Sequence, residues 1–96
     1  MKRITERELK NILYKHERWL MECEDGVKAD LKVDLSGADL RGTDLSNSNM
    51  FMAELVKTDL RGADLTGANL EFADLSLSKI EGAEMTDVNL DYAEMD

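Results

Sequence analysis

The chain has 96 residues, of which 21 are acidic and 12 basic, and it contains no proline and a single cysteine. This length allows one small domain with a limited core, and the net charge of −9 disfavours direct binding to nucleic acid or to anionic membranes. One cysteine cannot form an internal disulfide, and no apolar run approaches the roughly 18 residues that span a bilayer, so we expect a cytoplasmic protein.

Residues 1–28 are predicted to form an amphipathic capping helix and its connecting loop. Thr5 and Glu8 have the spacing of a capping box with Thr5 as the N-cap. The apolar stripe at helical spacing consists of Leu9, Ile12, Leu13, His16, Leu20 and Cys23. Gly26 predicts the end of the helix. Because the stripe must lie on something apolar, we expect this helix to cover one end of the C-terminal segment.

His16 and Cys23 are the two residues of this helix that suggest chemistry. Two helical turns separate them by about 10.5 Å, which is too far for a thiolate–imidazole pair. Neither has a second metal ligand within reach in the sequence. We therefore interpret His16 as a packing residue, with Trp19 at the edge of the same stripe. We predict no catalytic residue, no metal and no cofactor, and thus a protein that is not an enzyme.

Residues 29–96 repeat with a five-residue period from Val33 onward. Each unit carries one large aliphatic residue, namely Leu35, Leu40, Leu45, Met50, Leu55, Leu60, Leu65, Leu70, Leu75, Ile80, Met85, Leu90 and Met95. A small or β-branched residue precedes each of them by two positions, with a polar residue between. In extended chain, residues two apart point to the same side, so each unit places a small and a large side chain inward. The other two residues turn a corner, which predicts a solenoid of stacked coils.

These units closely resemble the A(D/N)LXX unit of the pentapeptide-repeat family. The clearest matches are Ala38-Asp39-Leu40-Arg41-Gly42, Ala63-Asp64-Leu65-Thr66-Gly67 and Ala68-Asn69-Leu70. The resemblance implies an all-β solenoid, a right-handed quadrilateral β-helix with four units and 20 residues per coil. Here it would have about three coils and one N-terminal capping α-helix. Ala29-Asp30-Leu31 stands one residue out of register with the later units, so the first corner is expected to be irregular.

If residues 20 apart stack, the outward positions form columns. Asn49, Asn69 and Asn89 then share one face, and the corner residues Met52, Phe72 and Tyr92 form an apolar strip that we expect to be exposed. The acidic columns are Asp34, Glu54, Asp74 and Glu94; Asp39 and Asp59; and Asp44, Asp64 and Glu84. These columns either serve as solvated spacers between the inward residues or bind a basic partner.

Two functions are compatible with these surfaces, both of them binding functions with a protein partner. In the first, the acidic columns imitate a DNA backbone and inhibit a nucleic-acid-binding protein such as a nuclease, a gyrase-like topoisomerase or a host-defence effector. The resemblance supports this, because members of the family that protect or inhibit DNA gyrase are thought to act in this way. In the second, the chain is a structural or assembly module that binds through the apolar strip and its open C-terminal coil.

The last coil is a further candidate for contact with a protein. No predicted helix covers it, and its large inward residues are Ile80, Met85, Leu90 and Met95. Uncovered ends of solenoids tend to pair, so we expect a homodimer joined through the C-terminal ends.

Overall fold

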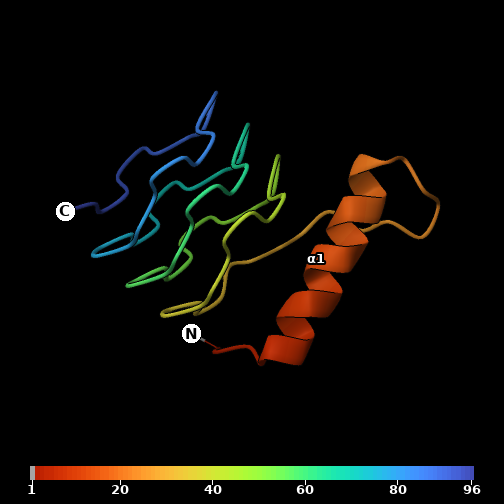
Figure 1. Ribbon diagram of the computed structural model, residues 1–96, viewed down its shortest axis with the longest axis horizontal. Helices are drawn as coiled ribbons and strands as arrows, with labels where there is room; N and C mark the ends of the chain where they lie inside the picture. The colour runs from red at the N-terminus through yellow and green to blue at the C-terminus, as the bar shows by residue number, and fades with distance from the viewer. Residues whose placement is uncertain (1) are drawn as a thin grey trace.

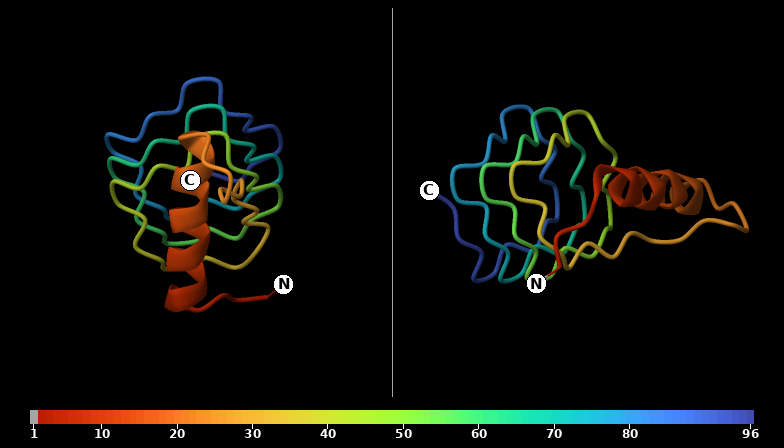
Figure 2. Two further views of the ribbon diagram at one scale, coloured as in Figure 1. Left: turned by 90° about the vertical axis from the view of Figure 1, so that its right-hand side faces the viewer. Right: turned by 90° about the horizontal axis from the view of Figure 1, so that it is seen from below.

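The computed structural model describes residues 2–96 and consists of one helix set against the end of a solenoid (Figure 1). Helix α1 spans Glu6–Leu20. The chain then returns through a loop and winds in stacked circuits of roughly square outline, and α1 lies across the first of them (Figure 2). The molecule measures 39 × 28 × 20 Å along its principal axes.

The start of α1 is the predicted capping box. The amide of Glu8 donates to Oγ1 of Thr5 over 3.1 Å, and Oε1 of Glu8 accepts from the amide of Thr5 over 3.0 Å. Two amides that have no carbonyl partner within the helix are satisfied in this way. The helix buries Leu9 and His16, and Ile12 and Leu13 pack partly buried against the core of the solenoid.

The end of α1 differs from the prediction, because the helix stops at Leu20 and not near Gly26. Glu22 adopts the left-handed conformation with a φ of 60°, and the amide of Cys23 donates to the carbonyl of Arg18 over 2.9 Å. This is the Schellman arrangement, with glutamate in the position that glycine usually takes. Gly26 lies in the return loop, where a side chain would collide with the backbone of α1.

The solenoid is built from parallel bridges between residues 20 positions apart, such as Asp39 with Asp59. The amide of Leu40 donates to the carbonyl of Asp59 over 2.8 Å, and the amide of Asp59 donates to the carbonyl of Ala38 over 3.0 Å. Successive bridges lie five residues apart, so four units complete one circuit. Because two residues of each unit form its corner, the bridges stay isolated. No strand longer than a single bridge occurs among residues 2–96.

The first circuit begins one residue out of register, as predicted from Ala29-Asp30-Leu31. Asp30 bridges Asn49, which is 19 positions away and not 20. The shift is absorbed in a tight turn in which the amide of Val33 donates to the carbonyl of Leu31 over 2.7 Å.

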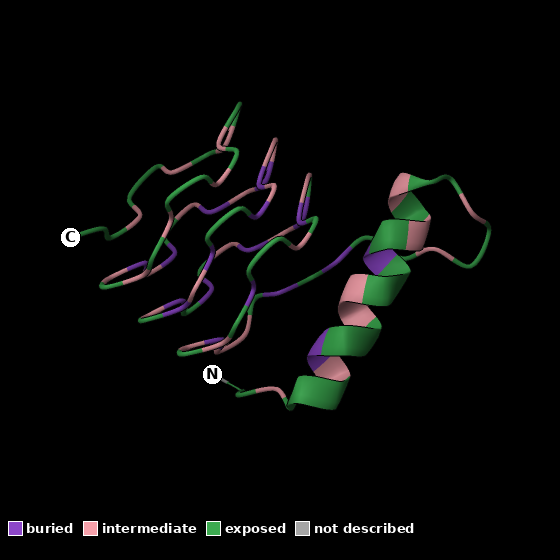
Figure 3. Cartoon of the chain, in the orientation of Figure 1, coloured by how far each residue is buried: buried purple, intermediate pink, exposed green. Residues whose placement is uncertain are grey.

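The large inward residues fill the centre of the stack, as the five-residue period predicts. Nine of the largest are fully buried, namely Leu31, Leu40, Leu45, Met50, Leu55, Leu60, Leu65, Leu70 and Leu75. Each contributes about 1.5–3 kcal/mol of hydrophobic stabilisation. Burial falls along the stack toward the C-terminal end (Figure 3).

Residues near the N-terminus extend the solenoid in a way that the sequence did not predict. Arg3 forms a parallel bridge with Asp34, and the amide of Asp34 donates to the carbonyl of Lys2 over 2.8 Å. Ile4 packs partly buried against the core. This short extended segment therefore covers one side of the first circuit before α1 begins.

Candidate binding surfaces

The outward aspartates and asparagines hold the corners in place. In each case one side-chain oxygen accepts a hydrogen bond from the backbone amide two residues later. The amides so bound are those of Ser36, Arg41, Ser46, Phe51, Arg61, Thr66, Glu71, Ser76 and Asp91. Because only an acceptor oxygen is needed, Asp and Asn are equivalent here. This structural role accounts for the regular spacing of these side chains without any partner.

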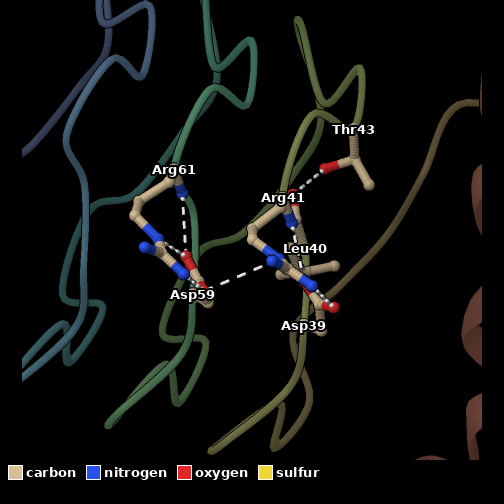
Figure 4. A network of polar contacts seen from close by, with 6 residues as sticks. All are labelled: Asp39, Leu40, Arg41, Thr43, Asp59 and Arg61. Atoms are coloured by element: carbon tan, nitrogen blue, oxygen red, sulfur yellow. Dashed lines mark hydrogen bonds and ion pairs between the residues drawn. The ribbon is translucent and has the colours of Figure 1, made fainter.

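The column of Asp39 and Asp59 is neutralised within the chain (Figure 4). Arg41 donates from Nη2 to Oδ2 of Asp39 over 2.8 Å, and Arg61 donates from Nη2 to Oδ2 of Asp59 over 2.6 Å. Arg41 also lies 3.7 Å from Asp59 through Nε. Hydrogen bonds from these guanidinium groups lower the pKa of both carboxyl groups to about 2. Lys79 occupies the next place in the column, so this side carries balanced charge.

The other two acidic columns differ in the ion pairs that they form. Asp34 lies 3.7 Å from Arg3. The column of Asp44, Asp64 and Glu84 forms no ion pair with any residue in the range 2–96. Hydrogen bonds from the side chain and backbone amide of Thr66 lower the pKa of Asp64, which favours its charged form. This column, like Glu54, Asp74 and Glu94 of the other column, carries negative charge that no ion pair within residues 2–96 compensates.

The apolar strip of Met52, Phe72 and Tyr92 is exposed, with 43%, 50% and 77% of each residue accessible to solvent. Phe72 and Tyr92 stack with ring centroids 4.9 Å apart and planes inclined by 10°. Phe51 meets Phe72 edge-on at 6.0 Å, and Lys32 lies 5.5 Å from the centre of the Phe51 ring. The result is a continuous aromatic ladder along one corner, closed by a lysine at one end.

The backbone of this strip is under strain. Met52, Phe72 and Tyr92 have φ values of 60°, 62° and 60°. A left-handed conformation costs a residue with a side chain about 1–2 kcal/mol. The corresponding corner of another face is occupied by Gly42, Gly62 and Gly82, for which this conformation carries no such cost. The same conformation occurs at corners that carry other side chains, such as Lys57 and Leu77, so it is a property of the corner and not of this strip alone.

His16 connects α1 to the solenoid, which the sequence alone did not indicate. It is fully buried; its Nδ1 accepts from the amide of Ala29 over 3.0 Å, and its Nε2 lies 2.7 Å from the carbonyl of Ser46. These partners assign the neutral tautomer with the proton on Nε2. Trp19 stacks on the imidazole at 5.5 Å. His16 is thus a packing residue that also carries two hydrogen bonds.

The C-terminal circuit leaves its inward side chains partly accessible. Ile80, Met85 and Leu90 are half-buried and Met95 is exposed, whereas the corresponding leucines of the preceding circuit are buried. This layer is the second apolar surface of the molecule.

Residues 2–96 contain no group of three or more His, Cys, Asp or Glu side chains placed to hold a metal ion. Within the same range, no helix has the length and apolar character needed to cross a membrane. Cys23 is a free, half-buried thiol.

Stacked five-residue units, outward acceptor side chains and an inward column of leucines define a pentapeptide-type solenoid. A profile of pentapeptide repeats matches residues 32–67 and 53–82, in 8 copies. The chain belongs to the pentapeptide-repeat family, whose members fold as right-handed quadrilateral β-helices and are generally non-enzymatic structural or binding modules.

Crystal structures of several pentapeptide repeat proteins are similar to this chain, and the first one described here supports the assignment. A pentapeptide repeat protein from the cyanobacterium Cyanothece 51142 has a TM-score of 0.70 and 32% identity, over 73% of this chain and 48% of that one. This chain therefore spans about half the length of the Cyanothece protein. A pentapeptide repeat protein from Nostoc PCC 7120 has a TM-score of 0.48 and 26% identity, over 86% and 74% of the two chains. One from the Arabidopsis thaliana thylakoid lumen has a TM-score of 0.33 and 35% identity, over 70% and 54%. A search of curated proteins found no match.

Proposed function

We infer that this chain is a non-enzymatic module that binds a protein partner through the apolar strip of Met52, Phe72 and Tyr92. The observation that supports this most directly is the stacked, exposed pair of Phe72 and Tyr92 held in left-handed backbone. Exposed aromatic side chains contribute large contact areas at protein interfaces and often dominate their binding energy. The left-handed backbone is common to the corners of this solenoid, so the stacking and exposure of the rings support the proposal and the strain does not.

The chemistry around the strip favours a partner that is both apolar and basic. Glu71 and Asp91 directly precede Phe72 and Tyr92 in the chain, so negative charge borders the rings. Lys32 already lies over Phe51 within cation–π distance. An arginine or lysine of a partner would find a ring with a neighbouring carboxylate at Tyr92, the most exposed residue of the strip.

A comparison of two variants tests this function. A partner is first isolated from a lysate of the source organism, and its affinity for the purified chain is then measured by titration calorimetry. We expect Phe72→Ala/Tyr92→Ala to weaken binding at least tenfold, because interface aromatics commonly contribute more than about 1.4 kcal/mol each. Asp64→Asn/Glu84→Gln, the matched control, should bind within a factor of about three of the wild type. Binding that survives the loss of both rings would refute the proposal.

A DNA-mimic inhibitor is the second candidate, and the uncompensated column of Asp44, Asp64 and Glu84 favours it. It predicts the opposite ranking of the two variants, together with competition between this chain and DNA for the partner. The neutralised column of Asp39 and Asp59 weakens this candidate, because the charge of both carboxylates is cancelled by Arg41 and Arg61.

Self-association through the C-terminal layer completes the proposal. In a rod of about three coils, the half-exposed Ile80, Met85 and Leu90 offer a second copy a surface of the same chemistry as the core. Sedimentation equilibrium of the 96-residue chain should then give a dimer mass, and Met85→Lys should give a monomer with an unchanged circular dichroism spectrum. A wild-type chain that stays monomeric at millimolar concentration would remove this part of the proposal.

A further inference from the structure

The edge of the first circuit that faces α1 is only partly paired. In the second circuit, the amides of Asp59 and Asp64 donate to carbonyls of the first circuit, those of Ala38 and Thr43, over 3.0 and 2.9 Å. The equivalent amides of the first circuit are those of Asp39 and Asp44. Among residues 2–96 neither donates to a backbone carbonyl, and neither residue's own carbonyl accepts from a backbone amide. Two adjacent sides of the square therefore present free strand edge.

A groove of about 530 Å³ lies along this edge, between the first circuit and α1. Its apolar lining includes Leu9 and Leu13 from the helix and Leu35 and Ala38 from the solenoid. Ala38 is half-buried, whereas the next residue of its column, Thr58, is buried. Of the two inward residues on this side, Ala38 is thus partly uncovered over the groove, whereas Leu40 is fully buried.

The ion pairs of Arg41 and Arg61 with Asp39 and Asp59 run across two circuits (Figure 4), and Asp39, at the end of this row, lines the groove. Asp59 contacts two guanidinium groups, that of Arg61 in its own circuit and that of Arg41 in the first circuit. Asp39 pairs with Arg41 alone and keeps 60% of its side chain exposed. Arg41 lies on the α1 side of Asp59. One cation in the same position relative to Asp39 would continue the alternation of charge. Lys10 on the groove wall does not fill this position, because it pairs with Glu6 over 3.3 Å.

The chain already binds an extended segment on the adjoining side of the same edge. Lys2 accepts from the amide of Asp34, Arg3 bridges Asp34 in parallel, and Ile4 packs against the core. The groove is continuous with this segment, since Arg3 and Ile4 line one end of it. Strand addition is thus a mode of contact that this edge supports within the molecule itself.

We propose that the groove binds an extended segment of a partner protein as a parallel strand along Asp39. The segment has a small residue, any residue, a large aliphatic residue and then an arginine. The small and the large side chains enter the groove over Ala38, Leu9 and Leu13. The carbonyl of the small residue accepts from the amide of Asp39, and the amide of the aliphatic residue donates to the carbonyl of Asp39. The arginine reaches the carboxylate of Asp39. This site is separate from the apolar strip and does not depend on it.

Nuclear magnetic resonance of the full ¹⁵N-labelled chain tests the proposal, with the peptide acetyl-Thr-Ala-Thr-Leu-Arg-Thr-amide as the probe. We expect the Asp39 amide to shift downfield and to exchange with solvent more slowly as peptide is added. The Asp59 amide, which is already paired, serves as the internal reference. N-methylation of the leucine amide should weaken binding about tenfold, because it removes one ladder hydrogen bond. Replacing the arginine of the peptide by glutamine should weaken binding several-fold.

Two variants of the chain locate the site. Thr43→Arg places a long side chain in the groove and should abolish the shifts, whereas Thr86→Arg, at an exposed corner remote from α1, should leave them unchanged. Phe72→Ala/Tyr92→Ala should also bind the peptide normally, which separates this site from the proposed function. The proposal is overturned if no amide shifts up to about 1 mM peptide, a concentration at which even weak binding is detected. It is equally overturned if the shifts centre on Asp34, because the peptide would then only displace Lys2–Ile4.

Discussion

Replacement of His16 by leucine should loosen the attachment of α1 to the solenoid. The imidazole is fully buried and bonds both the amide of Ala29 and the carbonyl of Ser46. Leucine fills similar space but leaves both groups without a partner. A buried polar group left unsatisfied costs about 1–3 kcal/mol, with the lower value for the half-buried Ser46, so we expect a loss of about 3 kcal/mol. That is a large part of the roughly 5–15 kcal/mol by which a domain is stable.

Urea unfolding followed by tryptophan fluorescence measures this loss directly. Trp19 is the single tryptophan of the chain and stacks on His16, so its emission reports the attachment of α1. With a slope of about 2 kcal/mol per molar urea, the expected shift of the midpoint is about 1.5 M. Far-ultraviolet circular dichroism, recorded in parallel, separates detachment of the helix from unfolding of the solenoid.

Two conservative variants divide the effect between the two hydrogen bonds. His16→Asn retains an acceptor near Nδ1 for the amide of Ala29, and His16→Gln retains a donor near Nε2 for the carbonyl of Ser46. Each should lose less stability than His16→Leu. Lys15→Ala, on the exposed side of α1, is the control and should stay within about 0.5 kcal/mol of the wild type. The reasoning fails if His16→Leu is as stable as that control.

Three further predictions concern the solenoid. Ser48 is buried and its hydroxyl has no partner, so Ser48→Ala should raise the free energy of unfolding by about 1 kcal/mol; Thr58→Val, which removes the 2.8 Å bond to Leu55, should lower it. A loss of stability in Ser48→Ala would show that its hydroxyl is bonded after all. Asp39 and Asp59 have folded pKa values of about 2 against an ordinary 3.8, so their contribution is present above about pH 4 and disappears as the pH falls toward 2. The double Asn variant should show a shallower acid loss in urea titrations, and an identical loss would contradict this. Lys57 is exposed and has a φ of 60°, so Lys57→Gly should raise the free energy of unfolding, measured by thermal unfolding, by about 0.5–1 kcal/mol. A destabilised variant would show that the backbone at Lys57 is not strained.

The repeat region was predictable because its structure is set by local spacing. Each unit carries its own small inward residue, outward acceptor and large inward residue, so the register of Leu40, Leu60 and Leu65 could be read without knowing any distant contact. The same spacing predicted the exposed corner of Met52 and Phe72. Even the irregular start was visible, because one misplaced residue displaces every later position of a five-residue period.

The N-terminal part was less predictable because its structure depends on one docking event. The stripe of α1 indicated that it packs on something, but not where His16 would lie relative to Ser46. Gly26 suggested a helix end because glycine favours left-handed backbone, yet Glu22 took that conformation and Gly26 served close packing of the loop. The extended segment Lys2–Ile4 is too short to show any periodicity. The pairing of Asp39 with Arg41 has a signal in the sequence, because the two residues stand two positions apart.

The structural roles of the five positions in each unit explain where a binding surface can arise in this fold. The inward pair is fixed by packing, and most outward residues are Asp or Asn, whose side-chain oxygen accepts a hydrogen bond from the corner amide. The exceptions are Glu54, Lys79, Glu84 and Glu94. Only the two corner residues are free of the core, and the second of them must accept a φ near +60°. A face acquires its own character at its corners, as with the arginine pairs beside Gly42 and Gly62 and the rings of Phe72 and Tyr92. The backbone alone does not select the residue type at such a corner, because Lys57 and Leu77 adopt the same conformation. The contact with a partner that we propose would account for the rings of Phe72 and Tyr92.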